Sequence, residues 1–204
     1  MDKTANPVQA RSQKTRDSLL KAALLMYEKK GYHKTTVDDI AAQAGVSTGI
    51  AYRYFKNKKD MLLSVISYGA ENIGILVSIG DIAIPESAAD IKGALKAVLT
   101  AFEEFHERYR GIHEELEGLQ HTDEDVRKLY SKITEEKMSN VTAMLAEFLQ
   151  DDTNIREKAY AAIGIMEQHC HMMMNNELWR LNAYVMRDLT IDAVLSVITG
   201  LNGA

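Results

Sequence analysis

Cysteine, proline and long apolar runs are scarce in this chain. Its 204 residues contain one cysteine and two prolines, so an intramolecular disulfide framework is excluded and helix breakers are rare. The most apolar run, 73–84, is interrupted by Asp81 and is too short to span a bilayer. The N-terminal residues lack the apolar core of a secretory signal. We therefore expect a globular protein of the cytoplasm without a membrane partner.

Apolar residues recur at helical spacing along nearly the whole chain, and no segment shows the alternation that is typical of a strand. This pattern predicts an all-α protein. The length allows a compact core and a small second unit. We expect three parts: a flexible basic and polar arm over 1–13, a small helical domain over 14–57, and a larger helical domain over 58–204.

Charge divides the chain in a similar place. Up to Val65 there are 12 lysines and arginines against 6 acidic residues, whereas the remainder has 12 against 23. A basic segment joined to an acidic one is typical of a phosphate-binding module attached to a module that does not bind nucleic acid. Arg11, Lys14 and Arg16, at and just after the N-terminal arm, are expected to act as a basic arm that touches the backbone or minor groove of a nucleic acid. An ordinary solvated face is the alternative interpretation of the lysines.

Motifs for catalysis are also missing. The sequence has no glycine-rich phosphate loop, nucleophile elbow or metalloprotease motif. The two histidines of His169-Cys170-His171 would point about 200° apart on a helix and cannot share one metal ion. His106 and His113 are seven residues apart and can share a face, but the sequence places no third ligand with them. We expect no enzyme, no cofactor and no metal site.

A capping signal opens the most informative segment of the chain. Thr36 and Asp39 have the spacing of a capping box, which predicts a helix through Ala44. Apolar residues at helical spacing give this helix one buried face, formed by Val37, Ile40 and Ala41.

Gly45 ends that helix, because glycine adopts the left-handed conformation most easily, and Val46 fills the corner. Ser47 is expected to cap a second short helix that runs to about Phe55. Asn57 with Asp60 starts a third. Two short helices joined by a tight glycine turn predict a helix-turn-helix.

This segment resembles the N-terminal DNA-binding domain of the TetR (tetracycline-repressor-like) family of bacterial transcription regulators. The resemblance rests on residues in the family's order and spacing: Gly31-Tyr32, Thr35-Thr36, Ile40-Ala41, Ala44-Gly45-Val46-Ser47, Gly49, Tyr52, Tyr54-Phe55 and Lys58. It covers the first third of the chain. Two residues depart from the pattern, since Ile50 stands where the family more often has a small polar residue and Ala51 where it usually has a larger apolar one.

The second short helix supplies the candidates for DNA contact. Thr48, Ile50 and Tyr52 are expected to read base edges, with Gly49 among them. Phosphates are expected to be held near helix ends, by Thr36, Ser47, Arg53, Tyr54 and Lys58. A place in the core is an equal alternative for Tyr54 and is favoured for Phe55.

Helices are predicted on both sides of this segment. One precedes it over 14–30 and ends at Gly31, and another follows over 58–79, before a loop through Pro85. Ser87 with Asp90 forms a second capping box, which opens a helix to about residue 108. A shorter helix is predicted to follow and to end near residue 118. Three more helices are predicted over 123–149, 153–175 and 183–200.

The last two helices are apolar on more than one face, so they must be covered on both sides. A partner subunit is an economical cover, and the resemblance implies a two-fold interface of four helices. Two central core helices are the alternative. The expected interface residues are Ala159, Ala162, Met173, Val185, Leu189 and Val197.

Methionines and aromatic residues of the larger domain suit an adaptable apolar pocket, and they suit a core equally well. The resemblance implies a ligand cavity in this domain. The candidate lining residues are Tyr68, Phe102, Phe105, His106, Tyr109, Met144, Met166 and His169.

The combined expectation is a homodimeric, sequence-specific DNA-binding regulator. We expect a repressor that a small, largely apolar effector releases from a pseudo-palindromic operator on double-stranded DNA. Two other classes of protein stay open: a ligand-independent architectural or accessory DNA-binding protein, and a helical-bundle enzyme with an incidental basic segment.

Overall fold

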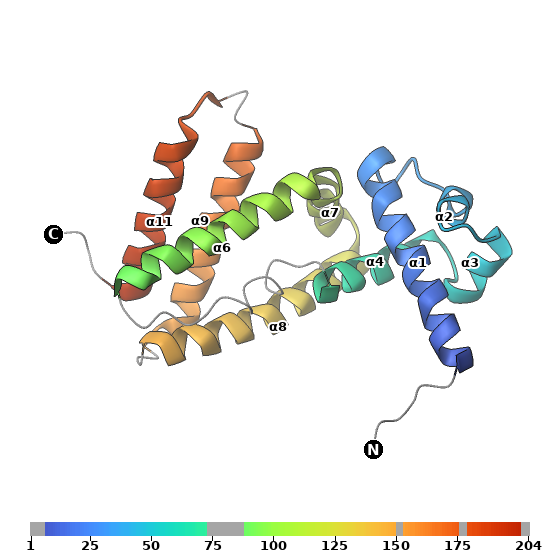
Figure 1. Cartoon of the computed structure of the whole chain (residues 1–204), viewed down its shortest axis with the longest axis horizontal. Helices are drawn as coiled ribbons and strands as arrows, with labels where there is room; N and C mark the ends of the chain where they lie inside the picture. The colour runs from blue at the N-terminus through green and yellow to red at the C-terminus, as the bar shows by residue number, and fades with distance from the viewer. Residues whose placement is uncertain (1–6, 73–87, 150–152, 176–178, 201–204) are drawn as a thin grey trace, which may run out of the picture. The chain divides into compact units, whose positions relative to one another are not determined.

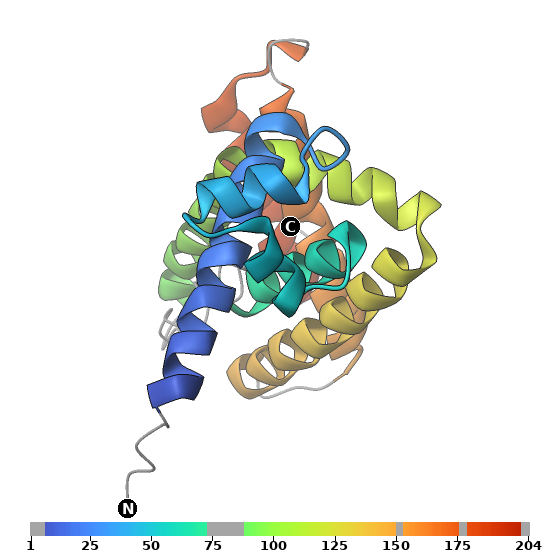
Figure 2. The same ribbon diagram turned by 90° about the vertical axis from the view of Figure 1, so that its right-hand side faces the viewer.

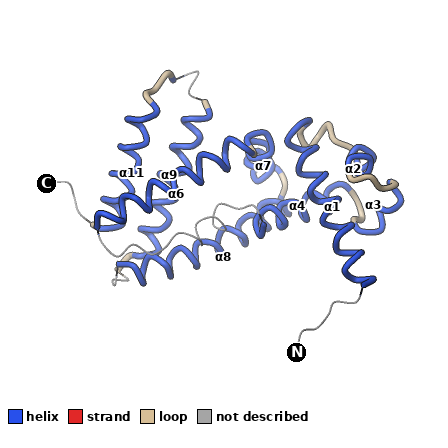
Figure 3. The backbone as a smooth tube through the Cα atoms, viewed as in Figure 1, coloured by secondary structure: helices blue, strands red, loops and turns tan. Residues whose placement is uncertain are grey.

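A computed structural model describes residues 7–72, 88–149, 153–175 and 179–200, which form α-helices and short connections without a strand (Figure 1 and Figure 3). The predicted all-α class is confirmed. The chain divides into two compact units: unit 1 is Met1–Asn72 with Tyr109–Tyr130, and unit 2 is Ile73–Arg108 with Ser131–Ala204. Within the described ranges, no helix has the length and apolar content needed to span a bilayer.

Unit 1 contains α1 (Pro7–Lys30), α2 (Val37–Gln43), α3 (Thr48–Tyr54), α4 (Lys58–Asn72), α7 (Arg110–Thr122) and the start of α8 (Glu124–Leu149). Helix α1 packs against α2 and α4, and α2 packs against α3 (Figure 2). Each of these helices has one apolar face, and these faces are buried against one another in a core. Its fully buried members include Leu19, Leu20, Tyr27, Ile40, Ala51 and Met61.

Helix α1 begins at Pro7 and not near Lys14. The expectation of a flexible arm up to residue 13 is therefore wrong for residues 7–13. Proline is well tolerated in the first turn of a helix, where its missing N–H has no intrahelical partner to lose. At its other end α1 stops as expected at Gly31, whose φ is 77°.

Reciprocal capping ties α7 to the end of α1. The carboxylate of Glu28 in α1 accepts the backbone N–H groups of Gly111 and Ile112, each at 3.1 Å, at the start of α7. In return, Glu115 of α7 accepts the backbone N–H groups of Tyr32 and His33 just after α1. These backbone N–H groups lie at or just beyond a helix end, where the helix offers them no carbonyl partner, and the two carboxylates accept their hydrogen bonds instead. This exchange places α7 in unit 1.

Unit 2 contains α6 (Ala88–Arg108), the part of α8 from Ser131, α9 (Ile155–Met174) and α11 (Ala183–Thr199). Helix α9 packs against both α11 and α6. These bounds agree with the predicted helices to within a few residues. The predicted continuation of α4 to residue 79, the loop through Pro85 and the capping box at Ser87 lie outside the described residues. The core of the unit includes Leu99, Phe102, Met166, Ile191, Val194 and Ile198.

Candidate nucleic-acid interface and the cavity of unit 2

The capping box at the start of α2 is present as predicted. Thr36 accepts the backbone N–H of Asp39 through Oγ1 at 3.1 Å, and Asp39 accepts the backbone N–H of Thr36 at 3.0 Å. The bond from the Thr36 backbone and a second from the ammonium of Lys30 lower the pKa of the Asp39 carboxyl. A negative charge in the first turn is also favoured by the helix dipole.

The turn between α2 and α3 is made by Gly45, whose φ is 70°. Its N–H donates to the carbonyl of Ala42 at 3.1 Å, and the N–H of Val46 donates to the carbonyl of Ala41 at 3.0 Å. A Cβ added at Gly45 would meet no atom within 4 Å. Glycine is therefore required by the backbone angle and not by crowding.

Helix α3 starts differently from the prediction. Ser47 occupies the N-cap position, but its side chain makes no capping hydrogen bond. The backbone carbonyl of Ser47 instead accepts the N–H groups of Ile50 and Ala51. The hydroxyl of Thr48 donates to the carboxylate of Asp38, which fixes the first residue of α3 to α2.

The faces of α3 are clearly separated. Ala51 is fully buried, which makes it the anchor of the helix in the core. Ile50 is half-buried, whereas Gly49 and Arg53 are exposed and the Tyr52 side chain is 54% exposed. The small Ala51 lets α3 lie close to the core, so the position that departs from the family pattern is completely covered.

The two aromatic residues at the end of α3 have different surroundings. Phe55 is 2% exposed and lies in the core, with the guanidinium of Arg16 over its ring at 5.6 Å. Tyr54 is half-buried, and its hydroxyl lies 3.3 Å from the hydroxyl of Ser12 in α1. Tyr54 therefore connects α3 to the N-terminal turns of α1 while keeping part of its ring exposed.

Two neighbouring lysines at the start of α4 are held in different ways. The ammonium of Lys58 donates to the carbonyl of His33 at 3.1 Å and lies 4.4 Å from the centre of the Tyr32 ring. Burial lowers the pKa of Lys58. The ammonium of Lys59 binds Asp125 at 2.6 Å and Asp123 at 2.9 Å, and these hydrogen bonds raise its pKa. Both of the carboxylates around Lys59 would repel a phosphate.

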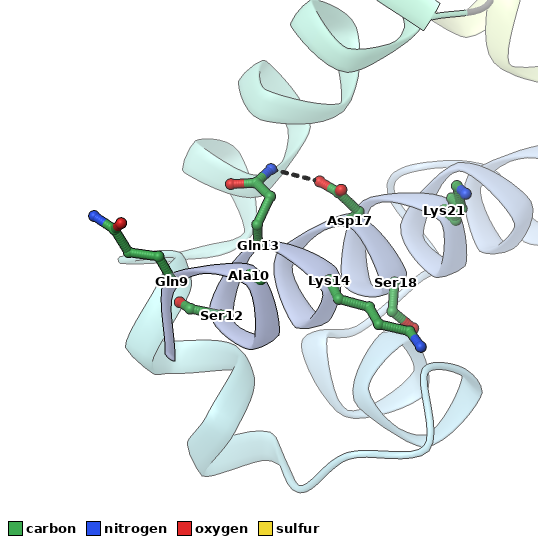
Figure 4. Close-up of a pocket in the computed structure, with 8 residues that line it drawn as sticks. All are labelled: Gln9, Ala10, Ser12, Gln13, Lys14, Asp17, Ser18 and Lys21. Carbon is green, nitrogen blue, oxygen red and sulfur yellow. Dashed lines mark hydrogen bonds between the residues drawn. The ribbon is translucent and has the colours of Figure 1, made fainter. Parts of the chain in front are cut away.

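A shallow hollow of about 850 Å³ runs along the N-terminal half of α1 (Figure 4). Seven of its eight lining residues have polar or charged side chains, and Gln13 donates to Asp17 across one edge at 2.8 Å. An open hollow along one side of a single helix lacks the enclosing walls of a small-molecule site. The lining residues, all from α1, are Gln9, Ala10, Ser12, Gln13, Lys14, Asp17, Ser18 and Lys21.

Unit 2 contains a cavity of about 380 Å³ between α6, α9 and α11. Its lining combines sulfur-containing side chains with charged ones: Glu103, His106, Glu107, Cys170, Met173, Met174, Ala183, Tyr184 and Arg187. Of the residues predicted to line a pocket, His106 alone borders this cavity. Three charged side chains, Glu103, Glu107 and Arg187, take part in this lining beside the apolar ones.

The other residues that were predicted to line the pocket do not border this cavity. Phe102 and Met166 are 1% and 3% exposed and belong to the core, against which Met144 packs. Phe105 is half-buried with its ring 5.7 Å from the ring of His106. Tyr68 and Tyr109 belong to unit 1. Helical periodicity cannot separate a core position from a pocket position, since both are apolar and face inward.

A polar network that the sequence did not reveal reaches the cavity through Glu103 and Arg187. The buried ring of His169 lies 2.9 Å from Glu103 through Nε2 and 2.9 Å from the hydroxyl of Thr190 through Nδ1. Arg187 donates to the other oxygen of Glu103 and to Thr100 at 2.8 Å. These residues come from α6, α9 and α11, so no local pattern could join them.

The predicted interface residues fall into three groups, which are buried, exposed and half-buried. Ala159 and Ala162 are 0% and 7% exposed and pack inside unit 2, so their side chains cannot reach another subunit. That part of the prediction is wrong. Val185 and Leu189 of α11 are 51% and 59% exposed. Met173 and Val197 are half-buried.

Comparison with known proteins supports the fold. Residues 19–65 match the family model described as bacterial regulatory proteins, tetR family. The HTH-type transcriptional regulator YerO of Bacillus subtilis (strain 168) is 23% identical over 192 residues. The aligned region covers 92% of this chain but 65% of YerO, so the chain spans less than two thirds of that relative.

Solved structures show the same arrangement of helices. A TetR-family transcriptional regulator from Rhodococcus sp. superposes with a TM-score of 0.73 at 18% identity, over 91% of this chain and 99% of the other. The regulator FadR from Bacillus subtilis in complex with stearoyl-CoA superposes with a TM-score of 0.63 at 23% identity, over 91% and 99% of the two chains. Residues 19–65 are therefore identified as the N-terminal domain of the tetR family of bacterial regulatory proteins, and the whole chain shares the fold of these solved regulators.

Proposed function

We propose that the chain is a homodimeric transcriptional repressor, which binds a pseudo-palindromic operator and leaves it when a small effector occupies unit 2. The observation that carries the DNA-binding part is the geometry of α3. Ala51 anchors one side of this short helix, and Gly49, Tyr52 and Arg53 are exposed. A helix held in this way can enter the major groove, and the basic charge up to Val65 attracts phosphates.

The proposed contacts follow from the surroundings of each side chain. Ile50 and Tyr52 would meet base edges from the outer side of α3. The Thr48 hydroxyl already donates to Asp38, so toward DNA it acts as an acceptor, which suits the amino group of cytosine or adenine. Phosphates would be held by Thr36, Ser47, Arg53, Tyr54 and Lys58.

Operator selection from random double-stranded DNA with the purified chain tests this function. The expected winners are pseudo-palindromes whose half-sites lie one helical turn apart, roughly 34–36 Å. Binding without sequence preference would support the ligand-independent architectural alternative. Absence of DNA binding at low salt would overturn both interpretations.

The cavity of unit 2 is the proposed effector site. Its volume of about 380 Å³ lies within the usual range for small-molecule sites. Met173 and Met174 offer adaptable apolar contacts, while Glu107 and Arg187 offer charge. The stearoyl-CoA complex of FadR likewise pairs a regulator of this fold with a ligand that has apolar and charged parts. We therefore propose an amphipathic effector.

Release follows from linkage. An effector that binds the conformation of low DNA affinity more tightly shifts the population toward it, and DNA weakens effector binding by the same factor. A screen of small molecules for release of the selected operator identifies the effector. Filling the cavity with Met174→Trp is expected to remove the response while DNA binding persists, which separates cavity binding from unspecific release.

Lys58 is expected to contribute one phosphate contact per protomer. Its ammonium has three donors, of which the carbonyl of His33 takes one. Lys58→Ala should weaken binding to all sequences alike and should reduce the slope of log affinity against log salt by about one unit per protomer. Gel-shift titrations over a salt series measure this slope.

Lys59→Ala is the matched control for this measurement, because Asp123 and Asp125 already neutralise that ammonium. Its slope should equal that of the wild type. Equal slopes for Lys58→Ala and the wild type would show that Lys58 serves only the fold.

Ile50 is expected to read a thymine. A branched aliphatic side chain forms no hydrogen bond, so its useful partner at a base edge is the thymine methyl group. Replacing that thymine by uracil deletes one methyl and should weaken wild-type binding about fourfold, from about 0.8 kcal/mol per buried carbon. The loss should vanish in Ile50→Ser. A uracil effect of the same size in both proteins would remove Ile50 from the base contacts.

A further inference from the structure

Three side chains of unit 2 bring ring nitrogens and a carboxylate together. His106 lies near the end of α6, and Glu167 and His171 lie on α9. Nε2 of His106 is 2.8 Å from Oε2 of Glu167. The rings of His106 and His171 have centroids 5.6 Å apart. One possible ligand atom from each of the three residues lies within 4.8 Å of the others.

The positions on α9 explain this convergence. Glu167 and His171 are four residues apart, so they project from the same side of the helix. His169 lies between them in sequence and is bonded elsewhere, to Glu103 and Thr190. His169 and His171 therefore face different neighbours and do not share an ion, as predicted. The ligands that join His106 come from another helix, α9, so the sequence around His106 does not show them.

The environment of His106 fixes which of its nitrogens faces Glu167. The ring is 1% exposed, and Nδ1 lies 2.8 Å from the backbone carbonyl of Phe102. A carbonyl oxygen only accepts, so Nδ1 carries the hydrogen. In a neutral ring Nε2 then presents a lone pair to the carboxylate. Two lone-pair atoms at 2.8 Å require either a proton between them, carried by Nε2 or by the carboxyl group, or a cation bound by both.

We propose that His106, Glu167 and His171 form a binding site for one divalent transition-metal ion such as Zn²⁺. With metal–ligand bonds of 2.0–2.2 Å, tetrahedral ligand atoms lie about 3.3 Å apart. The observed separations, from 2.8 Å to at most 4.8 Å, enclose this value. Small side-chain movements thus suffice to close the site.

Features around the cluster match those of known metal sites. A histidine ligand commonly donates its second nitrogen to a backbone carbonyl, as His106 does to Phe102. The Glu167 side chain is 38% exposed and the 380 Å³ cavity borders His106, so water and an entering ion can reach the ligands. Two imidazoles with one carboxylate favour zinc, nickel, cobalt or iron over magnesium and calcium.

Calorimetric titration of the chelator-treated full chain with Zn²⁺ tests the proposal. One ion per chain is expected, with Mg²⁺ giving no heat of binding at the same concentrations. Glu167→Gln keeps the size of the side chain and a hydrogen bond to His106, and it should weaken Zn²⁺ binding at least about tenfold. His171→Ala should do the same. The buried His106 is left unchanged, because its removal would disturb the core.

Matched controls are His121→Ala and Glu157→Gln, which alter exposed residues of the same types in α7 and α9. Their Zn²⁺ affinity should equal that of the wild type. If both Glu167→Gln and His171→Ala bound Zn²⁺ with wild-type affinity, the proposal would be overturned. It would also be overturned if Cys170→Ala were the one variant that lost Zn²⁺ binding. If the wild type did not bind Zn²⁺, the proposal would also be overturned, and a proton shared by His106 and Glu167 would explain their contact. The titration contains no DNA, so its outcome is independent of the repressor function.

Discussion

Leu189→Glu is expected to convert the proposed dimer into a folded monomer that binds its operator weakly. Leu189 is 59% exposed on α11, beside Val185 at 51% and Tyr184 at 84%. Such a row of exposed apolar side chains is typical of an interaction surface. A two-fold interface would bury two glutamates without partners, at about 1–3 kcal/mol each. The dissociation constant should therefore rise roughly 30-fold or more.

Sedimentation equilibrium measures the dissociation constant, and thermal melting followed by circular dichroism measures the fold. Because Leu189 is exposed in the single chain, the variant monomer should keep the helical content of the wild type and melt cooperatively. Leu25→Glu, at a position 38% exposed in α1, is the matched control and should remain dimeric. Val197 is a poorer probe, since it is half-buried and its replacement would mix folding with assembly. A Leu189→Glu dimer of unchanged affinity would place the interface elsewhere.

The local parts of the fold could be read from the sequence because their causes lie within a few residues. Thr36 and Asp39 cap α2 through atoms three residues apart, and Gly45 turns the chain by its own backbone freedom. Asn57 accepts the N–H of Asp60 at 2.8 Å, as its spacing predicted. In each case a short-range hydrogen bond or a single dihedral angle determines the element.

The association of α7 with the helix-turn-helix could not be predicted in this way. It depends on Glu28 and Glu115, which bond to backbone groups 82 to 84 residues away. On each helix these glutamates look like ordinary exposed acids. The same holds for Arg187 and Glu103 at the cavity, and for Glu167 beside His106. Long-range polar pairs leave no periodic signal, because one residue on each helix is enough.

Ala51→Asp is expected to destabilise unit 1 strongly, because it places a carboxylate where the structure leaves no exposed surface. Ala51 has 0% exposure on the inner side of α3. A buried charge without a partner costs about 3–5 kcal/mol, which is a large part of the 5–15 kcal/mol that stabilises a typical domain. Thermal melting should show a midpoint lowered by roughly 10 °C or more. Hydrogen exchange should show the loss of protection across α2 and α3.

Tyr52→Asp is the matched control, one residue further along the same helix and 54% exposed. An exposed substitution usually changes stability by less than about 0.5 kcal/mol, so this variant should melt like the wild type. Its new negative charge on the proposed groove face should nevertheless abolish operator binding by repelling the phosphates. The two variants thus separate the anchoring side of α3 from its reading side. If Ala51→Asp melted normally and Tyr52→Asp unfolded the unit, α3 would be rotated, and Ile50 would lose its place beside the bases.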